Sequence, residues 1–194
     1  MIPKISLKDL SSNNKSTISL LSEALTNHGF FVITDHEIPF SLFNRAYEYS
    51  EKFFNLESSI KYKYSFREHA GARGYTPFGK ETALGESVPD LKEFWHHGPI
   101  IDNTFDTRIM DNIVVNEIKD FNKVFDELFK EMNNLGSKLL SAISVSLDLP
   151  NNYFSESTNK GNSLLRLIHY PPSNNENIYR ARAVSYTHLR AHET

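Results

Sequence analysis

The sequence predicts an α+β fold of one domain, or of one domain and part of a second. Strand-like and helix-like segments alternate over residues 2–34, a long helical periodicity runs over residues 118–139, and another strand-like segment follows at residues 163–170. With 194 residues, of which 39% are hydrophobic, the chain has enough apolar side chains to form a core.

The N-terminal segment predicts a strand, a helix and a second strand. Residues 2–7 alternate apolar and polar side chains, as a half-buried strand does, and residues 11–15 form a polar break. Over Ser16–His28 apolar residues recur at spacings of three and four, and Gly29 stands where a helix commonly ends in a left-handed residue. The β-branched and aromatic run at residues 30–34 then predicts a buried strand.

More helical segments lead into a stretch that is dense in glycine and proline. Ser41 is the predicted N-cap of a helix, and a second, short helical piece is predicted over residues 56–64. Gly71–Gly79 predicts an extended or turning segment, in which the backbone matters more than the side chains. The core-facing side of the first helix is expected to carry Leu42, Ala46, Tyr49 and Phe53.

The clearest periodicity predicts one long amphipathic helix, from about Asn112 to Leu147. Pro150 and the polar run at residues 151–162 end it, and residues 163–170 are predicted to form a strand that the following prolines stop. The apolar residues of the helix recur at spacings of three and four: Ile118, Phe121, Phe125, Leu128, Met132, Leu135 and Leu139.

Charge and composition narrow the class of partner. Lys and Arg total 21 against 24 Asp and Glu, so a formal charge of -3 gives no long-range attraction to nucleic acid or to an anionic membrane. The chain has no cysteine, which excludes disulfides, thiolate metal sites and a cysteine nucleophile. Met1–Leu7 lacks a basic segment followed by a long apolar run. We therefore expect a cytoplasmic protein with a small-molecule partner, and we expect no nucleic-acid or membrane partner.

Several segments stand in an order that is typical of one enzyme family. They are Ile2–Leu7, His28–His36, Gly74–Pro77 with Pro89–Trp95, and Leu165–Pro172. Each alone is a weak signal, but together they span most of the chain in the correct order. In this the chain resembles the isopenicillin N synthase-like, 2-oxoglutarate- and iron(II)-dependent oxygenases, whose non-haem dioxygenase N-terminal region precedes an iron-binding jelly roll.

The resemblance implies a fold, cofactors and a reaction. The implied fold is α+β, with a helical N-terminal region and small sheet packed on the first strands of an incomplete double-stranded β-helix, or jelly roll. The implied domains are residues 1–160 for the N-terminal region, 161–183 for the first jelly-roll strands and 184–194 for a non-native tail. Full-length relatives use iron(II), held by two histidines and one carboxylate, and 2-oxoglutarate, which is converted to succinate and carbon dioxide while a small molecule is hydroxylated or desaturated.

The chain departs from the family pattern where that pattern supplies its iron ligands. In relatives an Arg-Ala-rich stretch leads into His-x-Asp, but here Tyr179–Ala183 leads to Val184 and Tyr186 in those two positions. The second family histidine and the arginine that binds 2-oxoglutarate are expected beyond Thr194. We therefore expect this chain to be catalytically incomplete and to bind neither cofactor, with no metal ligand and no catalytic residue assigned.

The last eleven residues, 184–194, resemble a translated sequencing-adapter or assembly scar, because agreement with the family stops abruptly. The opposing interpretation is a metal-binding helix face. His188 and His192 are spaced i and i+4, beside Glu193, although no third ligand comes from a defined second element.

Four residues are candidates for ligand contact, each with a structural alternative. The resemblance places the Tyr170 phenol in the pocket, on a carboxylate of the co-substrate or substrate, or else as a tyrosine packed at a strand end. Arg166 meets an anion in the cavity or lies outside on an alternating strand. Relatives that use 2-oxoglutarate often have Asn at the position of Ile168, so this contact departs from the pattern. Arg73 and Tyr75 select the substrate, or they make ordinary loop and strand-edge contacts.

The adjacent histidines His96 and His97 suggest a metal, yet neighbours on a strand face opposite sides, which favours core or hydrogen-bonding roles. Three functions stay open. The chain belongs to a 2-oxoglutarate-dependent iron oxygenase, to a non-catalytic short form that binds a ligand or a partner protein, or to an isopenicillin N synthase-like oxidase that does not use 2-oxoglutarate. The sequence leaves the substrate and the oligomeric state undetermined.

Overall fold

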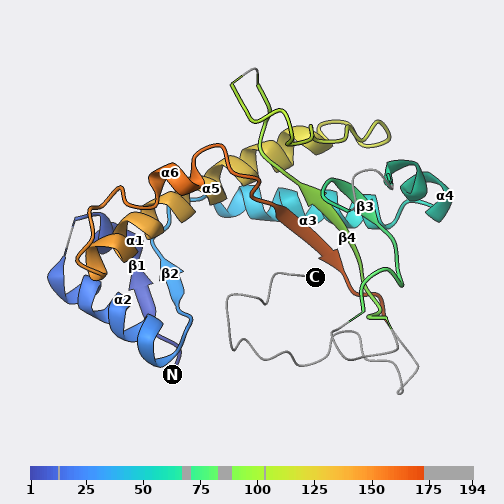
Figure 1. The fold of residues 1–194 in the computed structure, drawn as a ribbon. Helices are drawn as coiled ribbons and strands as arrows, with labels where there is room; N and C mark the ends of the chain where they lie inside the picture. Colours follow the sequence, from blue (N-terminus) through green and yellow to red (C-terminus); the bar gives the residue numbers. More distant parts are fainter. Residues whose placement is uncertain (13, 67–70, 83–88, 103, 173–194) are drawn as a thin grey trace. The chain divides into compact units, whose positions relative to one another are not determined.

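The computed structural model describes residues 1–12, 14–66, 71–82, 89–102 and 104–172 (Figure 1). Helices and short strands are mixed, as the predicted α+β class requires. The chain forms two compact units. Unit 1 comprises Met1–Arg45 with Glu127–Asn162, and unit 2 comprises Ala46–Asp126 with the chain from Ser163 on. The domain boundaries expected after residues 160 and 183 stay predictions.

Unit 1 opens with the predicted strand, helix and strand. Strand β1 (Lys4–Ser6) pairs in parallel with β2 (Val32–Thr34), with Ile5 opposite Ile33, and helix α2 (Lys15–Asn27) connects them. Parallel neighbours need such a crossover, because a tight turn cannot bring two strands into the same direction. Gly29 follows α2 with a φ of 74°, the left-handed conformation expected there.

A short helix stands where the sequence predicted the end of a strand and a polar break. Helix α1 spans Leu7–Ser11, and the hydroxyl of Ser6 accepts a hydrogen bond from the backbone N–H of Asp9 at 3.4 Å. This capping bond and the burial of Leu7 and Leu10 favour the helical turn over further strand. The alternating pattern of residues 2–7 was therefore right only over β1.

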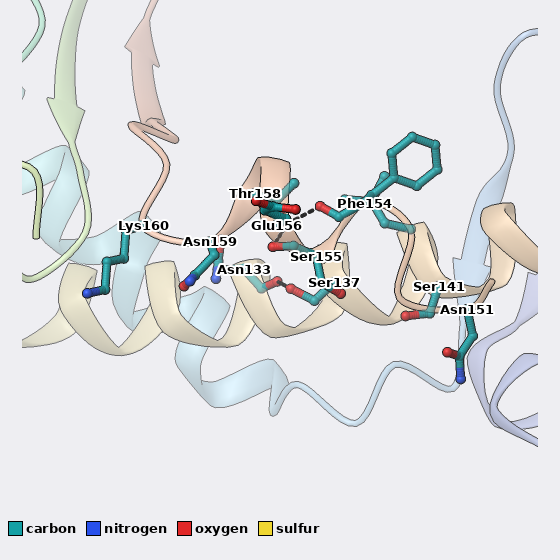
Figure 2. A pocket seen from close by; sticks show the side chains of 11 residues that line it. Asn133, Ser137, Ser141, Asn151, Phe154, Ser155, Glu156, Thr158, Asn159 and Lys160 are labelled. Carbon is teal, nitrogen blue, oxygen red and sulfur yellow. Dashed lines mark hydrogen bonds between the residues drawn. The ribbon is translucent and has the colours of Figure 1, made fainter. Parts of the chain in front are cut away.

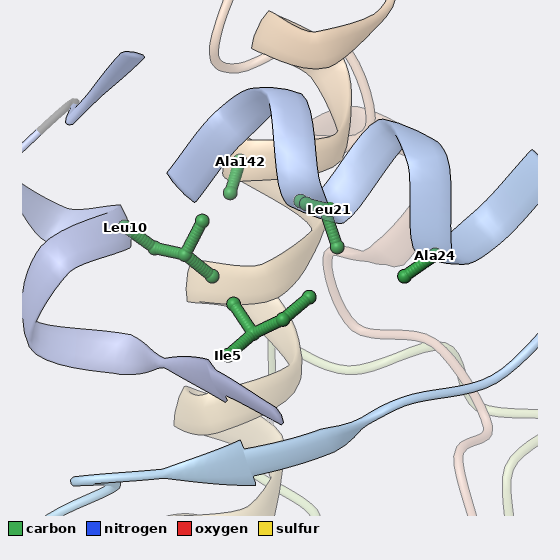
Figure 3. Packing of buried hydrophobic residues seen from close by; sticks show 5 residues of the cluster. All are labelled: Ile5, Leu10, Leu21, Ala24 and Ala142. Atoms are coloured by element: carbon green, nitrogen blue, oxygen red, sulfur yellow. The ribbon is translucent and has the colours of Figure 1, made fainter. Parts of the chain in front are cut away.

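The core of unit 1 lies between the β-α-β motif and helix α5 (Phe121–Ser146), of which residues from Glu127 on belong to this unit. Figure 3 shows Leu21 and Ala24 of α2 pointing toward Ile5 of β1, with Ala142 of α5 beside them. Strand β2 is less covered than predicted, since 41% of Val32 is exposed. A β-branched run indicates a strand but not how many of its faces are covered.

Helix α5 begins later than predicted. The helix was predicted from about Asn112, but residues 112–120 are not helical. Asn122 explains this start, because its side chain donates to the carbonyl of Ile113 at 2.8 Å and accepts from the N–H of Val115 at 3.1 Å. Asp120 has a φ of 63°, which a continuous helix cannot contain. Side-chain bonds to the backbone thus hold the preceding segment in a non-helical path.

The remaining helices follow the sequence closely, with one addition. Helix α3 (Phe40–Phe54) begins one residue before the predicted cap. Helix α4 (Ser58–Lys61) and the 3-10 turn η1 (Tyr62–Tyr64) occupy the predicted short helical piece. Helix α6 (Ser155–Thr158) lies inside the polar run that was predicted only to end the preceding helix.

In the described part of unit 2, the strands β3 (Gly74–Thr76), β4 (Glu93–His97) and β5 (Leu165–His169) form an antiparallel sheet in the order β3-β4-β5. Figure 1 shows β4 and β5 running side by side, and among the described residues this sheet is not closed into a barrel.

One face of this sheet packs on an aromatic core. The ring centroid of Trp95 lies 4.9 Å from that of Phe53 on α3 and 5.2 Å from that of Phe121, the first residue of α5. All three side chains are at most 1% exposed. Because side chains alternate along a strand, Phe94 and His96 lie on the opposite face. That face carries the cavity described next.

Candidate functional site

A cavity of about 770 Å³ lies on the face of the unit 2 sheet that points away from the aromatic core. Strand β4 contributes Phe94 and His96, and β5 contributes Arg166. Both aromatic and charged side chains line the cavity. Its aromatic lining includes Tyr62, Phe66 and Phe94, and its charged or polar lining includes Lys80, Glu81, His96 and Arg166.

Arg166 is held in one orientation. It stands opposite His96 in the β4–β5 register, and its Nε donates to Nε2 of His96 at 2.6 Å. The guanidinium carbon lies 4.4 Å from the centroid of the Phe94 ring, within the range of a cation–π contact. The Nη atoms lie 3.4 and 3.5 Å from the two carboxylate oxygens of Glu81. The N–H donors on the two Nη atoms of Arg166 therefore have longer contacts than the donor on Nε.

His96 is a neutral acceptor for Arg166. Its residue is 5% exposed, and Nδ1 lies 2.5 Å from the carbonyl oxygen of Gly71. Since an arginine can only donate, Nε2 accepts and the ring proton sits on Nδ1, where it is donated to Gly71. Burial lowers the pKa of His96 below 6.5, and the positive charge of Arg166 lowers this pKa further, against the opposing effect of the Gly71 hydrogen bond.

Glu81 is bound more closely to a lysine than to Arg166. Its carboxylate lies 2.8 Å from Nζ of Lys92, which also bonds Asp90 at 3.1 Å. Burial acts to lower the pKa of Lys92, but the hydrogen bonds with Glu81 and Asp90 outweigh it, so that the pKa is raised. Lys92 therefore stays charged, and a line of alternating charges runs from Arg166 through Glu81 to Asp90.

A hydrogen-bond network around a buried glutamate, Glu93, lies on the opposite face of the sheet. Glu93 is 1% exposed and lies 2.8 Å from Nζ of Lys61, 2.5 Å from the hydroxyl of Tyr75 and 2.7 Å from Nδ1 of His169. Lys61 also donates to the carbonyl of Phe54 at 2.9 Å. Burial, followed by the hydrogen bond to Glu93, raises the pKa of Tyr75. These bonds connect the three described strands of unit 2 to α4, so the role of Glu93 is structural.

The two adjacent histidines face opposite sides of β4, as strand alternation predicts. His96 lies in the cavity wall, whereas Nε2 of His97 lies 2.8 Å from the carboxylate of Asp126 on α5. His97 is fully buried. The two histidines therefore belong to separate hydrogen-bond networks, His96 with Gly71 and Arg166, and His97 with Asp126.

The structure brings two of the four sequence-predicted contact residues to the cavity. Arg166 and Tyr75 line it, although the Tyr75 hydroxyl is bound to Glu93 on the other side. Arg73 is 1% exposed and donates to the carbonyls of Ala72 and Met110, at 2.7 and 3.1 Å. Tyr170 is half-buried just after β5, and neither it nor Arg73 is among the lining residues. Their roles in ligand binding stay predictions.

Sequence reasoning missed His96 and Glu81 as cavity residues. The signal for His96 was its strand position opposite Arg166, which becomes visible only once the register is known. No local pattern marked Glu81. Val184, Tyr186, His188, His192 and Glu193 lie outside the described residues.

A second pocket, of about 530 Å³, lies in unit 1 between α5 and α6 (Figure 2). Its lining is mostly hydroxyl and amide groups, such as Asn133, Ser137 and Thr158. The hydroxyl of Ser137 donates to the Asn133 carbonyl, and that of Thr158 donates to the Phe154 carbonyl. Two charged side chains, Glu156 and Lys160, also line the pocket, but no aromatic-stacked arginine like Arg166 of the unit 2 cavity is among its lining residues.

The described residues do not fit an iron centre. Among them, no three histidine, aspartate or glutamate side chains lie close enough together to hold a metal ion. Within the same residues, no helix combines the length and the apolar character needed to cross a membrane.

Comparison with known proteins identifies the N-terminal part of the chain. Residues 2–117 match the family model described as non-haem dioxygenase in morphine synthesis N-terminal. The chain is 29% identical over 177 residues to gibberellin 20 oxidase 1 of Arabidopsis thaliana, with 88% of this chain and 46% of the relative covered. It is 31% identical over 172 residues to proline hydroxylase buaE of Petromyces alliaceus, covering 85% and 52%. The chain thus spans about half the length of the curated relatives it matches.

Solved structures share the fold. A Caulobacter crescentus protein described as a member of the 2OG-Fe(II) oxygenase family superposes with a TM-score of 0.81 and 32% identity, over 91% of this chain and 58% of that one. A full-length Neurospora crassa protein, solved in complex with alpha-KG, superposes with a TM-score of 0.71 over 88% of this chain and 54% of that one; at 22% identity this likeness supports the fold alone. The expected α+β fold, a helical region with small sheets that are not closed into a barrel within the described residues, is confirmed. The chain belongs to the non-haem, 2-oxoglutarate- and iron(II)-dependent dioxygenase family, whose N-terminal region it contains.

Proposed function

We propose that the protein to which this chain belongs is a 2-oxoglutarate-dependent iron(II) oxygenase that hydroxylates or desaturates a small molecule, with release of succinate and carbon dioxide. The observation that carries the proposal is a cavity of about 770 Å³ with an oriented arginine, in a chain that belongs to this family. That volume suits a small organic molecule.

The role proposed for this chain is to build and orient one wall of the ligand site. Arg166 is proposed to bind a carboxylate of the co-substrate or the substrate, because a guanidinium presents paired N–H donors to both oxygens. Tyr170 is proposed for the same ligand from its place one residue after β5. Arg73 and Tyr75 are proposed to influence substrate selection by fixing the segment that contains β3, since their polar atoms bond within the protein.

The iron and its redox chemistry are not assigned to the described residues, which bring no three suitable ligands together. When bound, such a metal supplies the activation of oxygen. The expected partner is a small molecule, with no nucleic acid and no membrane, and a cytoplasmic location is part of the same proposal. The formal charge of -3 supports the expectation that neither nucleic acid nor a membrane is a partner.

The test is succinate and carbon dioxide release from 2-oxoglutarate by the complete gene product, with iron(II) and candidate small molecules. The proposal expects both products in equal amounts, and their loss when iron is chelated. Ligand binding without turnover points instead to a non-catalytic module, and substrate oxidation without succinate points to an oxidase of the isopenicillin N synthase type. Either result overturns the proposal.

Residues 1–194 should be assayed in parallel by themselves. We expect no succinate and no stoichiometric iron from them, and iron bound one to one would contradict this. Sequencing the gene across codon 184 adds an independent check, because a His-x-Asp continuation after Ala183 supports the enzyme.

A further inference from the structure

We propose that Glu81 is a built-in competitor for the anion site of the unit 2 cavity, so that a ligand carboxylate binds Arg166 by displacing Glu81, which then stays on Lys92. This inference rests on the proposal that the cavity holds a small-molecule ligand. It adds a regulatory contact and a ligand chemistry to that site.

The receiving arginine is prepared for a carboxylate. His96, which is 5% exposed, accepts from Nε of Arg166 at 2.6 Å, and Gly71 fixes the ring proton of His96 on the other nitrogen. The guanidinium is also held over the Phe94 ring at 4.4 Å. Two contacts thus fix its inner edge and its plane, which leaves the Nη atoms as the edge available to a ligand.

The Glu81 carboxylate already lies at that edge, but its contact with Arg166 is loose. Its oxygens lie 3.4 and 3.5 Å from the Nη atoms, whereas charge-assisted guanidinium–carboxylate bonds are usually about 2.7 to 2.9 Å long. By contrast, Glu81 lies 2.8 Å from Nζ of Lys92. Losing the longer contact therefore costs Glu81 little, because its closer ion pair remains.

The ligand that fits this exchange is a carboxylate on an apolar or planar body. The cavity places the rings of Tyr62, Phe66 and Phe94 and the side chain of Leu164 around the charged groups. The cavity lining carries two cationic side chains, Arg166 and Lys80, against the one carboxylate of Glu81, so an anionic ligand is favoured over a cation. Two sources share this chemistry, namely 2-oxoglutarate and an organic-acid substrate.

The experiment measures binding by the complete gene product without added iron, in calorimetric titrations with 2-oxoglutarate and, separately, with phenylacetate. E81Q removes the competing charge, so we expect carboxylate affinity to rise roughly threefold to tenfold. K92Q removes the partner that holds Glu81 away, so affinity should fall. R166Q should lower affinity at least about tenfold, because the receiving donors are lost.

Opposite signs for E81Q and K92Q separate the exchange from a general loss of folding, which would weaken binding in both variants. E48Q is the matched control, since Glu48 is an exposed glutamate of unit 2 paired with Lys52, and its affinity should not change. Tighter binding of 2-oxoglutarate alone identifies the co-substrate as the anion, and tighter binding of phenylacetate identifies an organic-acid substrate.

Unchanged or weaker carboxylate binding in E81Q, with its thermal melt intact, would overturn the competitor role. Unchanged binding in R166Q, or equal binding of neutral phenylacetamide, would overturn the anion site altogether. Because these titrations need no turnover, they stand apart from the succinate assay. The proposed oxygenase activity can fail while the sign pattern holds, and the sign pattern can fail while succinate is released.

Discussion

At the scale of single residues, burial decides which charged groups are structural. Glu93 and Lys61 are 1% and 5% exposed, and every short contact of the Glu93 carboxylate is with a proton donor. A buried ion pair contributes little net stability when both partners are present, but removing one partner strands the other charge. Glu81 lies on the opposite, cavity side, in a looser set of contacts.

Replacing Glu93 with Gln tests this difference. The substitution leaves the Lys61 ammonium buried without its counter-charge, so we expect E93Q to lower the free energy of unfolding by about 3 kcal/mol or more. Urea denaturation followed by circular dichroism measures the change. E48Q, at an exposed ion pair, should leave the unfolding midpoint unmoved. Equal midpoints for E93Q and E48Q would show that the Glu93 network is not structural.

His96 predicts a pH dependence of stability. Its pKa in the folded protein is lowered below 6.5, first by burial, so the unfolded chain binds its proton more readily. The stability that His96 contributes is fully present above 6.5 and is lost as the pH falls from 6.5 toward its folded pKa. Urea unfolding between pH 5 and pH 7.5 should show this loss, and H96Q should reduce the slope. A slope that H96Q leaves unchanged would count against the buried neutral ring.

At the scale of elements, backbone geometry sets where β3 begins. Gly74 has a φ of 77°, and a Cβ placed there would lie 2.5 Å from the carbonyl oxygen of Tyr64 and 2.5 Å from Cδ1 of Ile113. Neither the conformation nor the space suits an L side chain. Gly136 in the middle of α5 is different, because a Cβ there would meet nothing within 4 Å.

The two glycines therefore predict opposite effects of alanine. G74A should lower the free energy of unfolding by roughly 2 kcal/mol or more, through strain and overlap. G136A should raise it by about 0.5 to 1 kcal/mol, because alanine loses less backbone entropy in a helix. Chemical denaturation of both variants under one set of conditions provides the comparison. A neutral G74A would contradict the close approach of η1 and β3.

The helices and strands could be predicted where the pattern of neighbouring residues determines them. The spacing of apolar residues located α2 and most of α5, because a helix repeats over a few neighbouring residues. The start of α5 was wrong by about two turns, since the Asn122 side chain binds backbone on a segment that periodicity alone cannot exclude. Helix α1 was missed because a single capping hydroxyl and two leucines decide it.

At the scale of the whole molecule, the proposed activity requires the cavity wall of this chain to act together with metal ligands that the described residues do not bring together. In the complete gene product, R166Q should lower kcat/KM for the ligand whose carboxylate it binds by roughly tenfold to a hundredfold. R166K should recover part of this, because a point charge replaces a fork of donors. Initial rates of succinate release measure both. An unchanged kcat/KM in R166Q would remove Arg166 from the site.

The sequence by itself determined the α+β class, the β-α-β start and the family, because helix periodicity, turn glycines and short motifs are properties of neighbouring residues. Only the tertiary structure decided which side chains meet. His96 and Arg166 are 70 residues apart, and Lys61 and Glu93 are 32 apart. These pairs depend on strand register and on which face of a strand is covered, and a slip of one residue would exchange the two faces. No local pattern contains that information, so the cavity became visible only in the folded chain.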